Sequence, residues 1–129
     1  MHSFPYKVTL EEILRGKLYE MQKPDVKLNL KMLLFRINYI RSLYNKPFVV
    51  TSGLRSPQEQ QKINPSAPKS NHLLGAAVDI SDPDGELFYW AKTNENILED
   101  VGIWCETRIG NWLHCQIYPP KSGNRFFNP

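Results

Sequence analysis

The chain has 129 residues, of which 41% are hydrophobic and 22% are charged, and its formal net charge is +3. These values exclude a mainly disordered chain and predict one soluble domain, residues 1–129, with a single core. The charge is mild and no dense Lys/Arg run exists, so we expect no nucleic-acid partner, and we expect a monomer.

Sequence features also bear on localisation. No stretch approaches the roughly 20 apolar residues that span a bilayer, and the N-terminal MHSFPYKVTLEE lacks the apolar run of a signal peptide. We therefore expect no membrane span and synthesis in the cytoplasm, with release by another agent if the substrate lies outside. Two cysteines permit at most one bridge, and in a cytosolic protein we expect both to be reduced.

The first half of the chain predicts helices around one strand. Thr9 and Glu12 form a capping-box pattern at the start of a short helix. Residues 27–44 carry apolar side chains close to helical spacing and predict the longest helix. The β-branched run PFVVTS, residues 47–52, is typical of a strand, and PQEQQKI, residues 57–63, predicts a short polar helix with proline at its first position.

The second half supplies more strands. AAVDI, residues 76–80, predicts a strand with Val78 and Ile80 on one face and Ala77 and Asp79 on the other. An aspartate between branched apolar residues implies a buried charge, and burying an unpaired carboxylate costs several kcal/mol or more. Another group must therefore compensate the negative charge of Asp79.

A helix and a hairpin complete the predicted fold. The helix runs from about residue 86 to residue 98, and the apolar strands IWCE (103–106) and WLHCQI (112–117) follow it. TRIGN joins these strands through a turn near Gly110. Strands and helices do not alternate regularly, so we expect an α+β fold with a small, mainly antiparallel sheet flanked by helices.

The hairpin fixes two cross-strand pairs. A turn centred near Gly110 sets Glu106 opposite His114, where side chains on one face lie about 5 Å apart. The same register sets Cys105 opposite Cys115 on the other face, which favours two packed thiols over a zinc-thiolate site.

Three residues form a candidate metal site. His72 and Asp79 flank a glycine turn, and His114 comes from a different strand. Two imidazoles and one carboxylate make a three-ligand zinc set with an open fourth position, the arrangement of catalytic sites, and the metal would compensate the aspartate. On spacing alone a second interpretation stands beside it, in which His72 caps a loop and His114 is an ordinary sheet histidine.

Three motifs carry a resemblance to a known family. SNHLLGAAVD, residues 70–79, resembles the S-x-H-x-x-G-x-A-x-D signature of the zinc D-alanyl-D-alanine carboxypeptidase and endolysin peptidase family. KPFVVTSGLRSP is similar to the strand and S-G-x-R-S of that family, and NWLHCQ is similar to its W-x-H element. The C-terminal PPKSGNRFF resembles the ending of phage-encoded members, so the resemblance runs from about Thr9 to Pro129.

The resemblance implies a fold and residue roles. It implies the Hedgehog/DD-peptidase fold and identifies His72, Asp79 and His114 as Zn²⁺ ligands. Arg55 matches the arginine that contacts the substrate carboxylate or polarises the scissile carbonyl, a role suited to a two-pronged guanidinium. The alternative is a surface arginine. Ser70 would orient the substrate or His72, or it is a plain turn serine.

One position departs from the family pattern. Many members carry the catalytic acid three residues before the last histidine, where this chain has Asn111. Because amide hydrolysis needs a proton carrier, we expect Glu106 to replace it; the alternatives are a substrate-binding or a structural role. Trp112 and Gln116 share the face of His114 and would line the cleft, and Gln116 is also a candidate partner of that histidine.

The resemblance thus implies a zinc peptidase acting on peptidoglycan stem peptides, as a D-Ala-D-Ala carboxypeptidase or as an endolysin-type endopeptidase. The alternative is a non-catalytic zinc module of a virion or a wall-binding protein, which the Asn111 departure permits. The bond that is cut depends on how the ends of the cleft are closed, and the sequence does not specify it.

Overall fold

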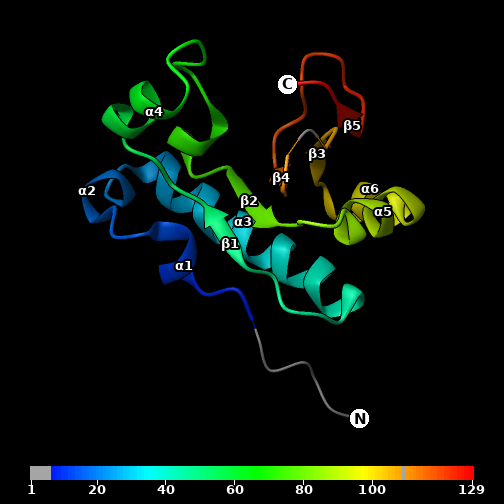
Figure 1. The fold of residues 1–129 in the computed structure, drawn as a ribbon. Helices are drawn as coiled ribbons and strands as arrows, with labels where there is room; N and C mark the ends of the chain where they lie inside the picture. The colour runs from blue at the N-terminus through cyan, green and yellow to red at the C-terminus, as the bar shows by residue number, and fades with distance from the viewer. Residues whose placement is uncertain (1–6, 109) are drawn as a thin grey trace.

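The computed structural model describes residues 7–108 and 110–129. Within these residues the elements are α1 (Leu10–Leu14), α2 (Leu18–Met21), α3 (Pro24–Tyr44), β1 (Val50–Ser52), α4 (Pro57–Ile63), the 3₁₀ helix η1 (Asn71–Leu74), β2 (Ala77–Ser81), α5 (Glu86–Thr93), α6 (Glu95–Val101), β3 (Trp104–Glu106), β4 (Trp112–Gln116) and β5 (Phe126–Phe127). The strands form one sheet in the order β1-β2-β4-β3-β5. All neighbouring strands are antiparallel except β3 and β5. The predicted α+β fold with a mainly antiparallel sheet and flanking helices is confirmed (Figure 1).

The long helix α3 supplies the largest part of the helical core. Its apolar residues recur at helical spacing, and Leu30, Leu33 and Ile37 are at most 1% exposed. The helix begins at Pro24, three residues before the predicted start, because proline is well suited to the first helical position. Residues of α3 and of the sheet belong to one buried hydrophobic cluster.

Strand alternation divides the sheet into a core face and a polar face. Val78 and Ile80 of β2 and Leu113 of β4 are buried in the hydrophobic cluster, as the alternation predicted. Asp79 lies between Val78 and Ile80 in the sequence, and His114 follows Leu113. Both side chains therefore point to the other face of the sheet, where they line a cleft. The fold therefore presents the polar residues of the two central strands to one cavity.

The predicted helix over residues 86–98 is two helices, α5 and α6, and the prediction of one continuous helix was wrong. The break lies at Asn94, whose backbone leaves helical geometry at φ −122° and ψ 37°. Its side-chain nitrogen donates to the carbonyl of Trp90 at 2.9 Å. Asparagine competes in this way with the helical hydrogen bonds, which explains the interruption.

The hairpin register was predicted correctly. Cys105 pairs with Cys115, and Trp104 pairs with Gln116, in the antiparallel ladder of β3 and β4. The predicted turn, residues 107–111, includes residue 109, which lies outside the described residues. Among the residues that the structure does describe, no helix combines the length and the apolar character needed to cross a membrane.

Candidate metal site and catalytic cleft

His72, Asp79 and His114 converge from three separate elements. His72 lies in η1, while Asp79 and His114 are direct partners in the β2–β4 ladder. Asp79 Oδ1 lies 2.9 Å from His114 Nδ1 and 3.3 Å from His72 Nε2. One ligand atom from each residue lies within 4.8 Å of the others, and all three residues are buried. The structure thus brings together the three residues that the sequence predicted as ligands.

The outer nitrogen of each imidazole has a fixed acceptor. His72 Nδ1 lies 2.8 Å from the carbonyl oxygen of Gly53, which can only accept a hydrogen bond. His114 Nε2 lies 2.8 Å from Gln116 Oε1, and the amide nitrogen of Gln116 donates to the carbonyl of Tyr118 at 2.7 Å. With the outer nitrogens protonated, His72 Nε2 and His114 Nδ1 face Asp79 and can either donate a proton to it or offer a lone pair to a metal ion. Such orientation by outer partners is typical of metal-ligating histidines, so the donor set fits a divalent metal ion.

A glycine makes the contact to His72 possible. A Cβ atom at Gly53 would lie 2.2 Å from the carbonyl oxygen of Ile13 in α1. The next residue, Leu54, donates its backbone N–H to that same carbonyl at 2.8 Å. Only glycine therefore allows the chain to pass this close to α1 and still present its own carbonyl to His72. Ser70 caps η1 by accepting the N–H of His72 at 3.2 Å, which favours its orienting role; contact with substrate stays a prediction.

The charges of the site depend on one another. Burial raises the pKa of Asp79, but hydrogen bonds from His114 and His72 outweigh it, and this pKa lies well below its usual range. Burial lowers the pKa of His114, but the hydrogen bond to Asp79 and the charge of Glu106 outweigh it, and this pKa is raised. Asp79 is therefore an ionised carboxylate that attracts positive charge between the two imidazoles.

Arg55 is anchored beside Asp79 and is not a surface side chain. Its side chain is 11% exposed, and its NH2 group lies 3.5 Å from Asp79 Oδ2. Its Nε donates to Ser52 Oγ at 3.0 Å, and its NH1 group donates to Gln60 Oε1 at 2.9 Å. The guanidinium thus holds the oxygen of Asp79 that faces away from His114, which would leave Oδ1 for a metal ion.

Gln60 is a site residue that sequence reasoning missed. It is 2% exposed, and its amide nitrogen donates to the carbonyls of Ala67 at 2.9 Å and Asn64 at 3.4 Å. It therefore links Arg55 to the loop that follows α4. The sequence carries no signal for this role, because a glutamine in a short polar helix predicts a solvent-exposed side chain.

Glu106 is the carboxylate nearest the outer side of His114. Its Oε2 lies 3.9 Å from His114 Nε2, and its side chain is 25% exposed. The hairpin predicted this proximity. Asn111, at the position that carries the acid in many family members, is exposed and does not line the cleft. Its backbone carbonyl accepts the N–H of Asp82 at 2.7 Å.

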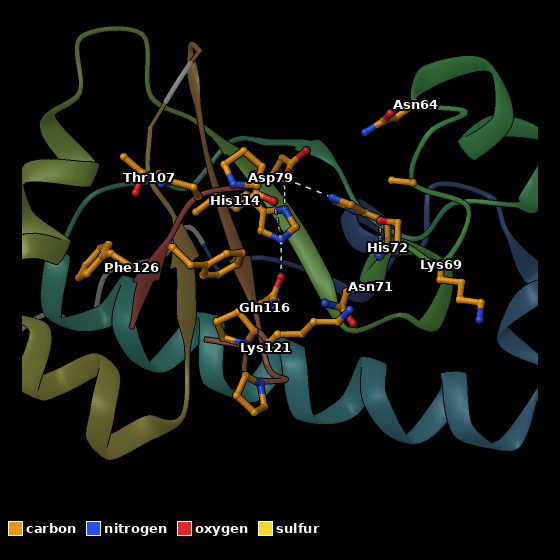
Figure 2. A pocket seen from close by; sticks show the side chains of 18 of the residues that line it. Asn64, Lys69, Asn71, His72, Asp79, Thr107, His114, Gln116, Lys121 and Phe126 are labelled. Atoms are coloured by element: carbon orange, nitrogen blue, oxygen red, sulfur yellow. Dashed lines mark hydrogen bonds and ion pairs between the residues drawn. The ribbon is translucent and has the colours of Figure 1, made fainter. Parts of the chain in front are cut away.

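These residues line one cleft of about 1080 Å³. It lies between the segment from α4 to η1 and the C-terminal residues 119–129, which Figure 1 shows on either side of the central strands. The predicted site residues in its lining are Arg55, Ser70, His72, Asp79, Glu106, Trp112, His114 and Gln116. Figure 2 shows His114 between Asp79 and Gln116 in this pocket, with His72 on the other side of Asp79. Trp112 is 42% exposed at the rim, whereas Gln116 is buried with its amide engaged.

Comparisons with known proteins place the chain in a family. The crystal structure of the L-Ala D-Glu endopeptidase ChiX from Serratia marcescens matches with 25% sequence identity and a TM-score of 0.44, covering 74% of this chain and 87% of that chain. No curated protein matches the chain at a significant level. The Peptidase M15 family matches over residues 7–116, most of the chain, and the chain therefore belongs to the Peptidase M15 family.

Proposed function

We propose that this protein is a zinc-dependent peptidase that hydrolyses peptidoglycan stem peptides, as a D-Ala-D-Ala carboxypeptidase or as an endopeptidase. The observation that carries the proposal is the convergence of the ligand atoms of His72, Asp79 and His114 in a large cleft of a Peptidase M15 member. The wall-peptide substrate follows from the resemblance of SNHLLGAAVD and its companion motifs to enzymes of that substrate class.

His72 Nε2, Asp79 Oδ1 and His114 Nδ1 are the atoms that would hold the ion. When bound, zinc supplies a Lewis acid that polarises the scissile carbonyl and acidifies water. Gly53 and Gln116 hold the two rings in the tautomers that this ligation requires. Arg55 holds Asp79 Oδ2, and its remaining N–H groups are available to an oxygen of the substrate.

Glu106 is the proposed proton carrier. Its carboxylate lines the cleft, lies at the outer edge of His114 and is partly exposed, so a substrate or water can reach it. It would accept a proton from the attacking water and return it to the departing amine, because an amine leaves an amide poorly unless it is protonated. Among the described residues the only other acidic side chain that lines the cleft is that of Asp79, which already contacts the two histidines.

The alternative, a non-catalytic zinc module, rested on the absence of an acid at residue 111. The placement of Glu106 supplies a carboxylate on the same face as His114, which favours the enzyme. The absence of a carboxylate at Asn111 therefore does not remove the capacity for acid-base chemistry. We propose that the protein acts on the wall after release from the cell, and the resemblance of PPKSGNRFF to the ending of phage-encoded members supports release by a phage.

Digestion of purified peptidoglycan tests the proposal. The zinc-loaded protein is incubated with wall material, and new amino and carboxyl termini are identified by mass spectrometry. We expect new termini within the stem peptides, their loss on chelation, and their return when zinc is restored. The new termini also identify which peptide bond of the stem peptide is cut. Zinc-loaded, folded protein that releases no stem-peptide termini would support the non-catalytic module instead.

A further inference from the structure

Two lysines line the cleft without a partner. Lys69 precedes the cap of η1, and Lys121 lies in the loop after β4; both are exposed and both line the cavity. Among the described residues neither side chain takes part in a hydrogen bond, an ion pair or a cation–π contact. In Figure 2 Lys69 lies at the right and Lys121 below the centre, with Asn71 between them in the view, while Thr107 and Phe126 lie at the left.

The other charged groups of the cleft are already engaged. Arg55 contacts Asp79, Ser52 and Gln60, and Asp79 also contacts both histidines. Glu106 faces His114. Lys69 and Lys121 therefore supply the uncompensated positive charge among the described side chains that line the cavity, and a ligand with a negative group would be attracted to them.

The segment that carries Lys121 is fixed at both ends. Ile117, at its start, donates its N–H to the carbonyl of Ala76 at 3.0 Å. At its end, the carbonyl of Arg125 accepts the N–H of Cys105 at 2.9 Å, and the Arg125 side chain donates to the carbonyl of Ile103 at 3.1 Å. These contacts hold residues 119–124 against the cleft as one of its walls.

This wall lies outside the part of the chain that matches the family. The match ends at residue 116, whereas Pro119, Pro120, Lys121, Ser122 and Asn124 line the cavity. The metal ligands all lie within the matched residues. Lys121 belongs to this wall and Lys69 to the segment on the opposite side of the cleft, so the two lysines line the cavity from both of its sides.

We propose that Lys69 and Lys121 select substrates that carry a free carboxylate near the scissile bond, so that the cleft prefers acidic stem peptides over their amidated forms. The inference rests on the proposed function and specifies its substrate class. A flexible ammonium group suits this task, because it attracts a carboxylate without demanding one fixed geometry. The effect of each exposed charge is modest, about threefold in kcat/KM, and about tenfold for the two together.

Matched substrates and variants test this selectivity. A set of synthetic stem peptides is prepared in which each free carboxylate is converted singly to a carboxamide. Cleavage is measured for the wild type, for Lys69→Gln, for Lys121→Gln and for the double variant, with Lys27→Gln as the control because Lys27 is exposed on α3 and away from the cleft. We expect one carboxamide to lower kcat/KM about tenfold in the wild type and in the control, and to have little effect in the double variant.

Binding separates this proposal from the proposed function. Calorimetric titration with the same peptides measures affinity whether or not they are cleaved. If the wild type cleaves none of them yet binds the acidic form more tightly, and the double variant does not, the charge selectivity stands and the peptidase assignment fails. A double variant that retains the full preference for the acidic peptide, or a wild type that shows no preference in cleavage or binding, overturns the proposal.

Discussion

His114 Nε2 lies 2.8 Å from Gln116 Oε1, two residues along the same strand. The glutamine amide cannot turn away, because its nitrogen donates to the Tyr118 carbonyl at 2.7 Å. The Tyr118 hydroxyl in turn donates to Asn29 on α3 at 2.5 Å, and Asn29 donates to the Leu74 carbonyl at the end of η1 at 2.9 Å. A chain of hydrogen bonds thus joins the helical layer to the outer edge of the candidate metal site.

Replacing Gln116 with leucine should weaken zinc binding. The leucine fills a similar volume but removes the acceptor that orients the His114 ring, and loss of such partners typically costs about 10- to 100-fold in metal affinity. Competition with a chromophoric chelator measures the change. Gln116→Glu keeps an acceptor at the same position and serves as the matched control. Equal zinc affinity in the wild type and the leucine variant would contradict the orienting role.

The protein should bind one zinc ion per chain. Three ligand atoms within 4.8 Å form one site, and His114→Ala removes one of them. Elemental analysis should show about one equivalent in the wild type and a large loss in the variant. The raised pKa of His114 means that its proton persists to higher pH than in an unfolded chain. Because the metal must displace that proton, zinc affinity should fall as pH is lowered, and a protein that stays metal-free with zinc supplied at neutral pH would refute the site.

Local patterns in the sequence predicted the parts of the fold and the site that depend on local chemistry. Strand alternation placed Asp79 and His114 on one face, and the turn near Gly110 set the β3–β4 register. The predicted capping box of Thr9 and Glu12 is present as a hydrogen-bonded pair, and the structure adds a second box, of Ser56 and Glu59, which was not predicted. Where one face of a strand is buried, the alternation of apolar and polar residues permits only one pairing register with the neighbouring strand, because a shift by one residue would expose the apolar side chains.

Contacts between distant segments were not predictable in the same way. β5 is two residues long and pairs with β3 from about twenty residues away. Such a short strand has no alternation of apolar and polar residues from which the sequence could predict it. The hydrogen bond that Gln60 accepts from Arg55 depends on the tertiary position of α4, and the sequence of that helix is mainly polar and does not single out Gln60 as a buried residue. The cleft wall at residues 119–124 is a loop without an apolar pattern, and its position follows from contacts at its two ends.

Cys105 and Cys115 should be free thiols that react only after unfolding. Both are 0% exposed, and their sulfur atoms lie 3.7 Å apart, too far for a disulfide bond. The hydrogen bond shared with Cys105 and burial raise the pKa of Cys115, so little reactive thiolate forms. Thiol titration should detect almost no rapid reaction in native protein and two thiols in denaturant. Absence of free thiols in denatured, unreduced protein would contradict this prediction.

Replacing Arg55 with lysine should reduce activity more than stability. A lysine keeps the charge, but it cannot contact Ser52, Gln60 and Asp79 together as the guanidinium does. Charge-assisted hydrogen bonds contribute roughly 1.5–3 kcal/mol, so kcat/KM should fall about 10- to 100-fold. Steady-state kinetics and thermal melting measure the two effects. Lys62→Gln, at the exposed end of α4, is the control, and unchanged kcat/KM in Arg55→Lys would remove Arg55 from the catalytic site.

Glu106→Gln should abolish most of the turnover and leave the metal site in place. Glutamine has the same shape but cannot carry a proton, and general acid-base catalysis typically contributes about 10²- to 10⁴-fold, so kcat should fall by that factor. Zinc content and melting temperature should change little, because Glu106 lies 3.9 Å from His114 and is not among the three ligands.

Asn111→Ala is the control that makes this test decisive. Asn111 occupies the position of the acid in many family members, yet here its side chain is exposed and outside the cleft, so its removal should alter kcat by less than about threefold. Both variants are assayed on the same stem peptides at equal zinc occupancy. If Glu106→Gln cleaves at the wild-type rate, the assignment of Glu106 fails whatever the effect of Asn111→Ala, because the Asn111 amide cannot carry a proton. If both variants and the wild type turn over alike, neither residue transfers the proton, and the carrier must be sought among the other groups that line the cleft.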